Sequence, residues 1–304
     1  TGDSAAALRD AVDRVAAFAA ANTPAEGDQQ PSTFELVSSM PPERWRDDVV
    51  AVGRDKIAAG TLDKVVLARE LVLRTDRPIP TANVLRRLRE AFPAAIIFAV
   101  DGFCGASPEL LVGRHRDVVR AHPLAGTSPR AADLSADQAS AAALLSSSKD
   151  RWEHRITIDW LLDGLLPFCS YVDAEPEPSI VSLANVHHLG TLVEGRLSSP
   201  AASVLELLGA LHPTPAVGGA PQQVALDLIG EIEQIDRGRY AGPVGWLDAE
   251  GNGAFAVGIR SAAIDGRNAR IMAGVGVVAD SDPDAELAET RNKFKAMLGA
   301  LIQP

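Results

Sequence analysis

Short apolar runs separated by turn residues fill most of the chain and predict its secondary structure. Residues 64–74 (KVVLARELVLR) are rich in β-branched side chains and predict a strand, and residues 94–100 (AAIIFAV) predict a buried strand. Asn-Gly and Asp-Gly turns separate three apolar runs between residues 243 and 278, which indicates an antiparallel meander. Further strands are expected at 109–114, 117–126, 179–186 and 187–197. Helices are expected at 5–21, 42–59, from Pro80 onward, 148–166, 201–211, 221–235 and from Pro283 to the end of the chain.

The order of these elements favours an α+β fold. Helices and antiparallel strands mix without a regular βαβ rhythm, so a doubly wound parallel sheet is disfavoured. We expect residues 1–304 to form a single large layered α/β sandwich domain with mostly antiparallel sheets, flanking helices and an active site in a cleft between two subdomains. Residues 1–60 are then a peripheral N-terminal part, with a polar linker at 22–32, and residues 61–304 form the core. Because the chain begins at Thr1, without a methionine, we expect this N-terminal part to be incomplete.

Composition and charge limit the kinds of molecule that this protein is expected to bind. With 46% hydrophobic residues among 304, the chain can bury a large core. Its 29 basic and 40 acidic residues give a net charge of −11, which would repel a nucleic-acid backbone or an anionic membrane surface. No apolar run is long enough to span a bilayer, and Cys104 and Cys169 show no metal or disulfide spacing. We therefore expect a cytoplasmic protein that contacts neither nucleic acid nor membrane and binds small anions where cations gather locally.

Two ionisable residues stand at the ends of apolar strands. Lys64 begins the strand at 64–74, and Glu109 follows a Ser-Pro turn directly before another strand. Both positions suit ordinary solvated side chains. Alternatively, a desolvated lysine with a neutral amine can act as a base, and a glutamate that points into a cleft can act as an acid. The spacing alone leaves both alternatives open.

Two carboxylates and a lysine lie at helical spacing on one predicted helix, and a third carboxylate lies on another. Glu286, Glu289 and Lys293 share one face of the C-terminal helix, and Glu153 lies on the amphipathic helix at 148–166. A solvated helix face is the ordinary explanation of both groups. If Glu153 met Glu286 and Glu289 across a cleft, their oxygens would suit Mg²⁺, a hard cation that bridges to anionic substrates.

Other segments have features of a ligand pocket. Gly126 permits a close backbone approach and Thr127 offers an amide and a hydroxyl, although a plain tight turn fits equally well. His188 and its neighbour His187 face opposite sides of a predicted strand, so that one of them can be functional. Arg260 lies in an apolar strand and needs a partner, for which a carboxylate is the natural choice. Glycines in the strand end AGVGV (273–277) would let a ligand lie against the backbone.

Taken together, these segments resemble the chorismate-utilising enzymes, and within them the isochorismate synthases. The resemblance covers about residues 60–300, and its motifs appear in the order typical of the family. They are DKVVLAR (63–69), SPELL (107–111), PLAGT (123–127), KDRWEH (149–154), HHLGT (187–191), LHPTPAVGG (211–219), FAVGIR (255–260), AGVGV (273–277) and ELAETRNKF (286–294).

Three positions sort the chain within the family that it resembles. Lys64 indicates water as the nucleophile, because members that add ammonia need no base at this position. Ala125 stands where aminodeoxychorismate synthases carry a covalent lysine, which disfavours that subclass. Salicylate synthases tend to have threonine where this chain has Ala216, and alanine is typical of isochorismate synthases. The resemblance therefore implies a reaction that stops at isochorismate.

The resemblance also implies a role for each site residue. Lys64 would deprotonate a water that attacks C2 of chorismate, and Glu109 would protonate the hydroxyl that leaves C4. Mg²⁺ held by Glu153 and Glu289, with Glu286 close by or acting through water, would bind the ring carboxylate. Arg260 and Tyr240 would hold the enolpyruvyl carboxylate. The full set of predicted substrate contacts is Gly126, Thr127, His188, Ala216, Tyr240, Arg260, Gly274, Val275, Gly276 and Lys293.

The resemblance further implies a monomer that needs no glutamine amidotransferase subunit and serves menaquinone or siderophore synthesis. Two alternatives stay open. One is a salicylate synthase, which also eliminates pyruvate, and the other is a non-catalytic homologue that binds chorismate. The presence of Lys64 and Glu109 argues against the second.

Overall fold

Two long central strands organise the largest sheet. The structure is a computed structural model and describes residues 31–302. Strands β2 (Lys64–Thr75) and β16 (Asn268–Val277) pair antiparallel along ten residues, from Val65 opposite Val277 to Arg74 opposite Asn268. They lie inside a seven-stranded sheet of order β1-β2-β16-β15-β4-β3, in which β12 also pairs with β2. The other members are β1 (Phe34–Ser38), β3 (Ile96–Val100), β4 (Phe103–Ser107), β12 (Gly219–Ala220) and β15 (Ser261–Asp265).

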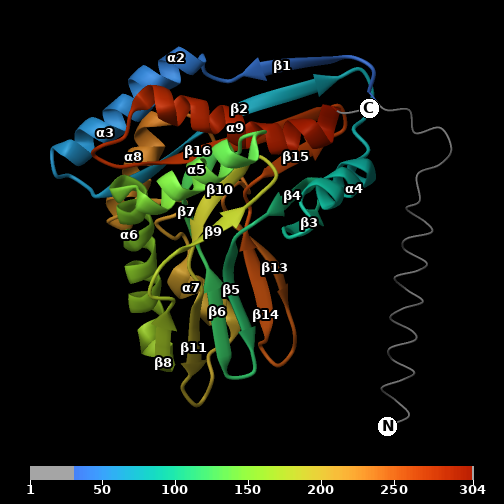
Figure 1. Cartoon of the computed structure of the whole chain (residues 1–304). Helices are drawn as coiled ribbons and strands as arrows, with labels where there is room; N and C mark the ends of the chain where they lie inside the picture. Colours follow the sequence, from blue (N-terminus) through green and yellow to red (C-terminus); the bar gives the residue numbers. More distant parts are fainter. Residues whose placement is uncertain (1–30, 303–304) are drawn as a thin grey trace, which may run out of the picture.

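A six-stranded sheet and a three-stranded sheet complete the described strands. The six-stranded sheet has the order β13-β14-β5-β6-β11-β8 and extends downward from the largest sheet in Figure 1. Its strands are β5 (Leu110–His115), β6 (Val118–His122), β8 (Cys169–Ala174), β11 (Val193–Leu197), β13 (Pro243–Leu247) and β14 (Gly253–Val257). The three-stranded sheet, of order β7-β10-β9, consists of β7 (Leu124–Pro129), β9 (Ser179–Ser182) and β10 (Val186–Gly190).

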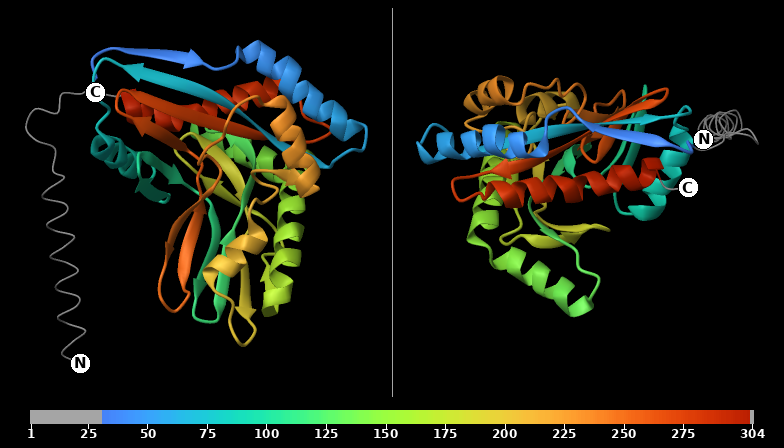
Figure 2. Two further views of the ribbon diagram at one scale, coloured as in Figure 1. Left: turned by 180° about the vertical axis from the view of Figure 1, so that it is seen from behind. Right: turned by 90° about the horizontal axis from the view of Figure 1, so that it is seen from above.

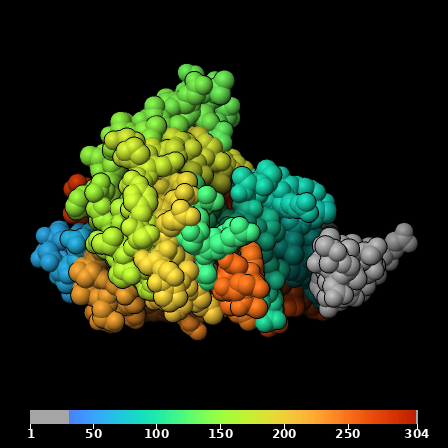
Figure 3. All heavy atoms as spheres, turned by 90° about the horizontal axis from the view of Figure 1, so that it is seen from below, coloured from blue at the N-terminus to red at the C-terminus, as the bar shows by residue number. Residues whose placement is uncertain are grey.

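Helices cover the sheets, and two of them are central to the site. The C-terminal helix α9 (Pro283–Ile302) lies along β16, as the right-hand view of Figure 2 shows, and α6 (Ser148–Leu165) runs beside the six-stranded sheet. Helix α5 (Leu134–Ser146) projects from the body of the molecule in Figures 2 and 3. The remaining helical segments are α2 (Pro42–Arg44), η1 (Trp45–Val50), α3 (Ala51–Ala58), α4 (Thr81–Ala91), η2 (Leu166–Phe168), α7 (Val204–Leu211) and α8 (Gln222–Ile232).

Strand β2 is buried on both faces, which explains why its apolar residues do not alternate with polar ones. On one face, Leu73 packs into a hydrophobic cluster with Phe294 of α9, and Leu67 packs into another with Trp45. On the other face, Lys64, Val66 and Ala68 are each at most 6% exposed. A strand covered on both sides reads as a continuous hydrophobic run. This burial extends to Lys64 at the start of the strand, whose side chain is 0% exposed.

The predicted α+β class with mostly antiparallel sheets is confirmed, but three predicted strands are corrected. The expected burial of residues 94–100 is wrong: β3 is an edge strand, and Ile96 and Val100 are 41% and 50% exposed. Its run of apolar residues gave no indication that one side of the strand lacks a neighbour. Residues 117–126 and 187–197 are each divided between two strands that belong to different sheets.

The meander predicted over residues 243–278 is also wrong. It consists of two hairpins, β13–β14 and β15–β16, which belong to different sheets. The chain passes from one sheet to the other at residues 258–260, where Arg260 has a left-handed φ of 50°. Arg260 therefore lies in a connection and not within a strand. The sequence prediction also missed β4 and α5, and its helix at 5–21 lies outside the described residues.

Candidate active site

A small buried pocket lies where the three sheets meet α6 and α9. Its volume is about 50 Å³, and we call it the central pocket. Twelve predicted site residues line it: Glu109, Gly126, Thr127, Glu153, His188, Ala216, Tyr240, Arg260, Gly274, Gly276, Glu289 and Lys293. Residues distributed over 185 positions of sequence, from Glu109 to Lys293, are thus brought together by the fold.

Three predicted site residues do not line the central pocket. Val275 is 0% exposed and packs into the hydrophobic core, because its side chain points away from the face of β16 on which Gly274 and Gly276 line the pocket. Glu286 lies one helical turn before Glu289 and contacts Lys149. Lys64 lies directly beneath the pocket lining and is described next.

Lys64 and Glu153 form a buried ion pair under Gly276. The Nζ atom of Lys64 lies 3.2 Å from Oε1 of Glu153 and 3.5 Å from its main-chain oxygen. A Cβ atom on Gly276 would lie 2.0 Å from Oε1 of Glu153 and 3.1 Å from Cε of Lys64. A side chain at position 276 would therefore displace the carboxylate end of Glu153 from the wall of the pocket.

Glu109 is a buried carboxyl whose environment favours the protonated form. It is 3% exposed and follows β4 at the edge of the central pocket. Burial raises the pKa of Glu109 to about 7, while a hydrogen bond from the amide of Leu124 and the charges of Lys64 and Arg260 act in the opposite direction. A carboxyl with a pKa near neutrality can donate a proton at physiological pH, as a general acid must.

Arg260 is buried, and His188 orients it. The Nη2 atom of Arg260 lies 2.9 Å from Nε2 of His188, and Nδ1 of His188 lies 3.0 Å from the carbonyl oxygen of Gly126 and 3.1 Å from Oγ1 of Thr127. Because Arg260 can only donate, Nε2 accepts and Nδ1 carries the hydrogen. Burial, and then the charge of Arg260, hold the pKa of His188 well below its ordinary value, so the ring is neutral.

The carboxylate partner that we expected for Arg260 is not found among the described residues. Its Nε atom is buried without a hydrogen-bond partner, and Glu109 and Glu289 act on it only through their charges. An arginine that is 8% exposed with an unsatisfied donor at a pocket wall is suited to an anionic ligand.

Four carboxylates from α6 and α9 lie near one another. Sequence analysis predicted Glu153, Glu286 and Glu289 but missed Asp150, which precedes Glu153 by three residues just as Glu286 precedes Glu289. This repeated spacing of three was the signal that could have identified it. Burial raises the pKa of Asp150, with the charges of Glu153 and Glu289 acting in the same direction. Burial and then Glu289 raise the pKa of Glu286 to about 7.

Lysines neutralise this acidic group in the structure. Nζ of Lys149 lies 2.6 Å from Oε1 of Glu286, and Nζ of Lys293 lies 2.6 Å from Oε1 of Glu289 and 2.8 Å from the carbonyl oxygen of Gly274. Within residues 31–302, no three Asp, Glu, His or Cys side chains stand close enough together to hold a metal as they are placed. The donor chemistry nevertheless fits Mg²⁺, because mutually repelling buried carboxylates are the ligands that this hard cation prefers.

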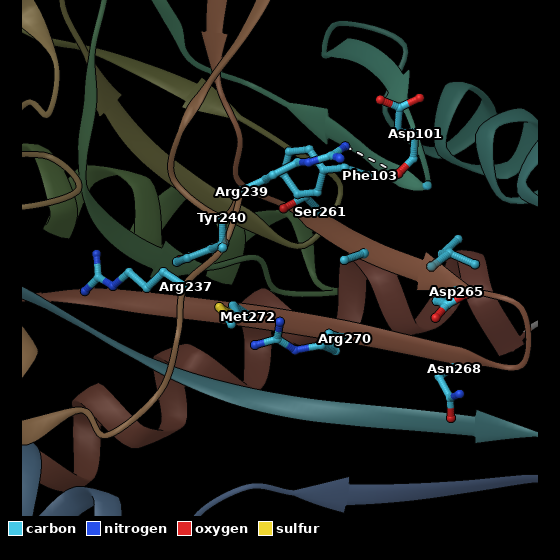
Figure 4. Close-up of a pocket in the computed structure, with 14 residues that line it drawn as sticks. Asp101, Phe103, Arg237, Arg239, Tyr240, Ser261, Asp265, Asn268, Arg270 and Met272 are labelled. Carbon is cyan, nitrogen blue, oxygen red and sulfur yellow. Dashed lines mark hydrogen bonds between the residues drawn. The ribbon is translucent and has the colours of Figure 1, made fainter.

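A second cavity lies outside the central pocket and shares one wall with it. Its volume is about 410 Å³, and Tyr240 lines both cavities. Figure 4 shows Arg237, Arg239 and Arg270 around it, but each already bonds to the protein, Arg239 for example to the main-chain oxygen of Val100 at 2.7 Å. None of the predicted acid, base or carboxylate residues lies there.

Comparison with known proteins identifies the family. A family model described as chorismate binding enzyme matches residues 2–302. The chain belongs to this family. Isochorismate synthase DhbC of Bacillus subtilis (strain 168) is 42% identical over 280 residues, a match that covers 88% of this chain and 70% of DhbC. The resemblance inferred from the sequence motifs is thus confirmed.

Solved structures of this family share the fold. The menaquinone-specific isochorismate synthase MenF of Escherichia coli is similar with a TM-score of 0.82 and 31% identity, over 92% of this chain and 65% of MenF. Anthranilate synthase component I of Streptococcus pneumoniae TIGR4 is similar with a TM-score of 0.78 and 28% identity, over 96% of this chain and 66% of that protein. The described part of the chain contains no helix with the length and apolar character needed to span a membrane.

Proposed function

We propose that this chain is an isochorismate synthase that converts chorismate to isochorismate. The observation that carries the proposal is the pairing of two buried ionisable groups with opposite roles, Lys64 and Glu109, at one small pocket. Lys64 is 0% exposed and Glu109 is 3% exposed. The curated relative DhbC, at 42% identity, bears the name of this activity.

The proposed reaction uses one base and one acid. Lys64, which can act as a base only once its amine has given up its own proton, removes a proton from a water molecule, and the water oxygen forms a bond to C2 of the chorismate ring. The ring double bond shifts, and the C–O bond at C4 breaks. Glu109 gives its proton to the departing hydroxyl, which leaves as water. One water is consumed and one is released, so the reaction is an isomerisation.

The remaining pocket residues bind and orient the substrate in this proposal. Arg260, held by His188, pairs with the enolpyruvyl carboxylate, and Tyr240 lies beside it on the pocket wall. Ala216 leaves the wall near the ring small and apolar, which agrees with a product that is not processed further. Thr127 and the backbone of Gly126 also line the pocket.

We also propose Mg²⁺ as the cofactor. Glu153 and Glu289 would hold it, with Glu286 and Asp150 alongside, and it would neutralise the ring carboxylate of the substrate. Its support is the acidic group shared by α6 and α9, in which burial and mutual repulsion raise the pKa values of Glu286 and Asp150. The cytoplasmic location, the monomeric state and the pathway served stay predictions.

Product analysis tests the proposal directly. The purified protein is incubated with chorismate and Mg²⁺, and the products are separated by chromatography. Isochorismate as the main product is expected, and added ammonium should not change it. Salicylate with pyruvate would instead establish the salicylate synthase alternative. A folded protein that binds chorismate without converting it would establish the non-catalytic homologue.

A further inference from the structure

A chain of polar side chains outside the central pocket connects α5 to strand β10. The carboxylate of Asp137 on α5 accepts hydrogen bonds from Nε of Arg130 at 2.8 Å and from the amide of Ala131 at 2.9 Å. Its Oδ1 atom lies 3.1 Å from Nε2 of His187, whose Nδ1 atom lies 2.8 Å from Oγ of Ser182 on β9. Asp137 and His187 are 7% and 3% exposed, so solvent competes little for these bonds.

The next residue along β10 reaches the central pocket. His188 follows His187 and faces the other side of the strand, where it contacts Arg260. The pairing of β10 with β7 shifts register between His188 and Leu189, which is a bulge at the point where the strand meets the site. A bulge re-aims the side chains beside it and removes part of the ladder that would otherwise fix their direction.

We propose that Asp137 and His187 are positioning residues that hold His188, and through it Arg260, in the orientation that binds the enolpyruvyl carboxylate. The inference rests on the proposed function of the central pocket. The pairing of β10 with β9 is regular at His188, and Gly126 and Thr127 contact its ring, but the pairing with β7 shifts there. The position of His188 relative to β7 and the pocket therefore depends also on how the preceding residue is anchored. The bond from His187 to Asp137 supplies that anchor, and Arg130 fixes Asp137 in turn.

A hydrolytic role for Ser182, His187 and Asp137 fits the geometry less well. The order of contacts resembles a catalytic triad, but the carboxylate of Asp137 is already shared with Arg130 and an amide, both of which reduce its ability to stabilise an imidazolium. Because successive residues of β10 face opposite sides, His187 lies on the side away from the reacting groups. That position suits an orienting role instead.

The test compares variants that break or keep the anchor. His187→Leu and Asp137→Asn remove it, whereas His187→Gln places an amide nitrogen near the position of Nε2 and keeps it. The matched control is Ser140→Ala, which removes another bond of α5, from Oγ of Ser140 to the carbonyl of Pro129 at 2.8 Å, without touching His187. Thermal unfolding of each variant separates loss of fold from loss of orientation.

We expect His187→Leu and Asp137→Asn to raise the KM for chorismate about tenfold with kcat within about twofold, because binding remote from the reacting atoms is weakened. Calorimetric titration with chorismate should show the same rise in Kd without reliance on turnover. His187→Gln and Ser140→Ala should stay within about twofold of the wild type on both measures.

Two outcomes overturn the inference. One is an unchanged KM and Kd in both anchor-breaking variants, and the other is a loss of kcat and melting temperature together, which would reveal a purely structural role. A wild type that binds chorismate but forms no isochorismate overturns the proposed function instead, and the calorimetric Kd values still decide the role of Asp137 and His187.

Discussion

Replacing Glu109 with glutamine should inactivate the enzyme and yet stabilise it at alkaline pH. Burial raises the pKa of Glu109 from 4.5 to about 7. A carboxyl with a raised pKa in the folded state binds its proton more tightly there than in the unfolded chain. It therefore contributes stability that is fully present below pH 4.5 and lost as the pH rises through about 7.

The size of this effect follows from the two pKa values. At about 1.36 kcal/mol per pKa unit, the difference between the two pKa values lowers the free energy of unfolding by about 3 kcal/mol above pH 8. At pH 5, where Glu109 ionises mainly in the unfolded chain, the loss is about 1 kcal/mol. Glutamine has a similar shape and cannot ionise, so Glu109→Gln should escape this loss. The stability of the variant relative to the wild type should rise by about 2 kcal/mol between pH 5 and pH 8.

Urea unfolding followed by tryptophan fluorescence at each pH measures this difference. Only its change with pH matters, so any constant cost of the amide cancels. The matched control is Glu231→Gln, which makes the same change of side chain at an exposed position. A Glu109→Gln difference that is flat from pH 5 to pH 8 would refute the reasoning from burial.

The same substitution tests the catalytic role. Loss of a general acid should lower kcat by about 10² to 10⁴ fold. In the wild type, kcat/KM should fall about tenfold per pH unit well above pH 7, because it follows the protonated fraction of Glu109. Wild-type turnover by Glu109→Gln would show that another group protonates the leaving hydroxyl.

Four further substitutions test other parts of the site. Lys64→Ala should lower kcat at least about 100-fold with chorismate binding still measurable by calorimetry, since it removes the proposed base; near-normal rates would exclude that role. Arg260→Gln should raise KM about 100-fold with a smaller effect on kcat, and an unchanged KM would place the enolpyruvyl carboxylate elsewhere. Glu289→Gln should weaken Mg²⁺ binding in calorimetric titrations about tenfold or more, whereas equal affinity would exclude it as a ligand. Gly276→Ala should abolish turnover by displacing Glu153, while Gly230→Ala, where a Cβ would meet nothing within 4 Å, should leave activity intact.

Local sequence patterns predicted the individual strands and hairpins of this fold better than they predicted which strands lie beside them in a sheet. The hairpins β13–β14 and β15–β16 were visible from their turn residues, which act over a few positions. That these hairpins belong to different sheets depends on the left-handed backbone at Arg260, a residue type that gives no sign of such a conformation. The exposure of β3 likewise depends on which strands lie beside it and not on its own residues.

The residues of the candidate site could be predicted because the family motifs are distinctive. The corrections to these predictions depend on the three-dimensional positions of the side chains. Glu109, Glu153 and Arg260 line one pocket as expected, although their motifs gave no distances. Asp150 escaped notice because an acidic residue near a helix N-terminus is common and needs no special explanation. The bond between Arg260 and His188 was not predicted, because a histidine two motifs away gives no sign that it will accept a bond from this arginine.

The charge balance of the site explains how an acidic protein can recognise a dianion. Lys64, Lys149 and Lys293 each pair with one carboxylate of α6 or α9, so these three cations are offset within the protein. Arg260 forms no such pair among the described residues, and it is therefore the cation left to attract the enolpyruvyl carboxylate. The ring carboxylate would instead face Glu153 and Glu289, which repel it. A divalent cation between these groups reverses the local field, which is the physical reason for expecting that chorismate binds tightly only together with Mg²⁺.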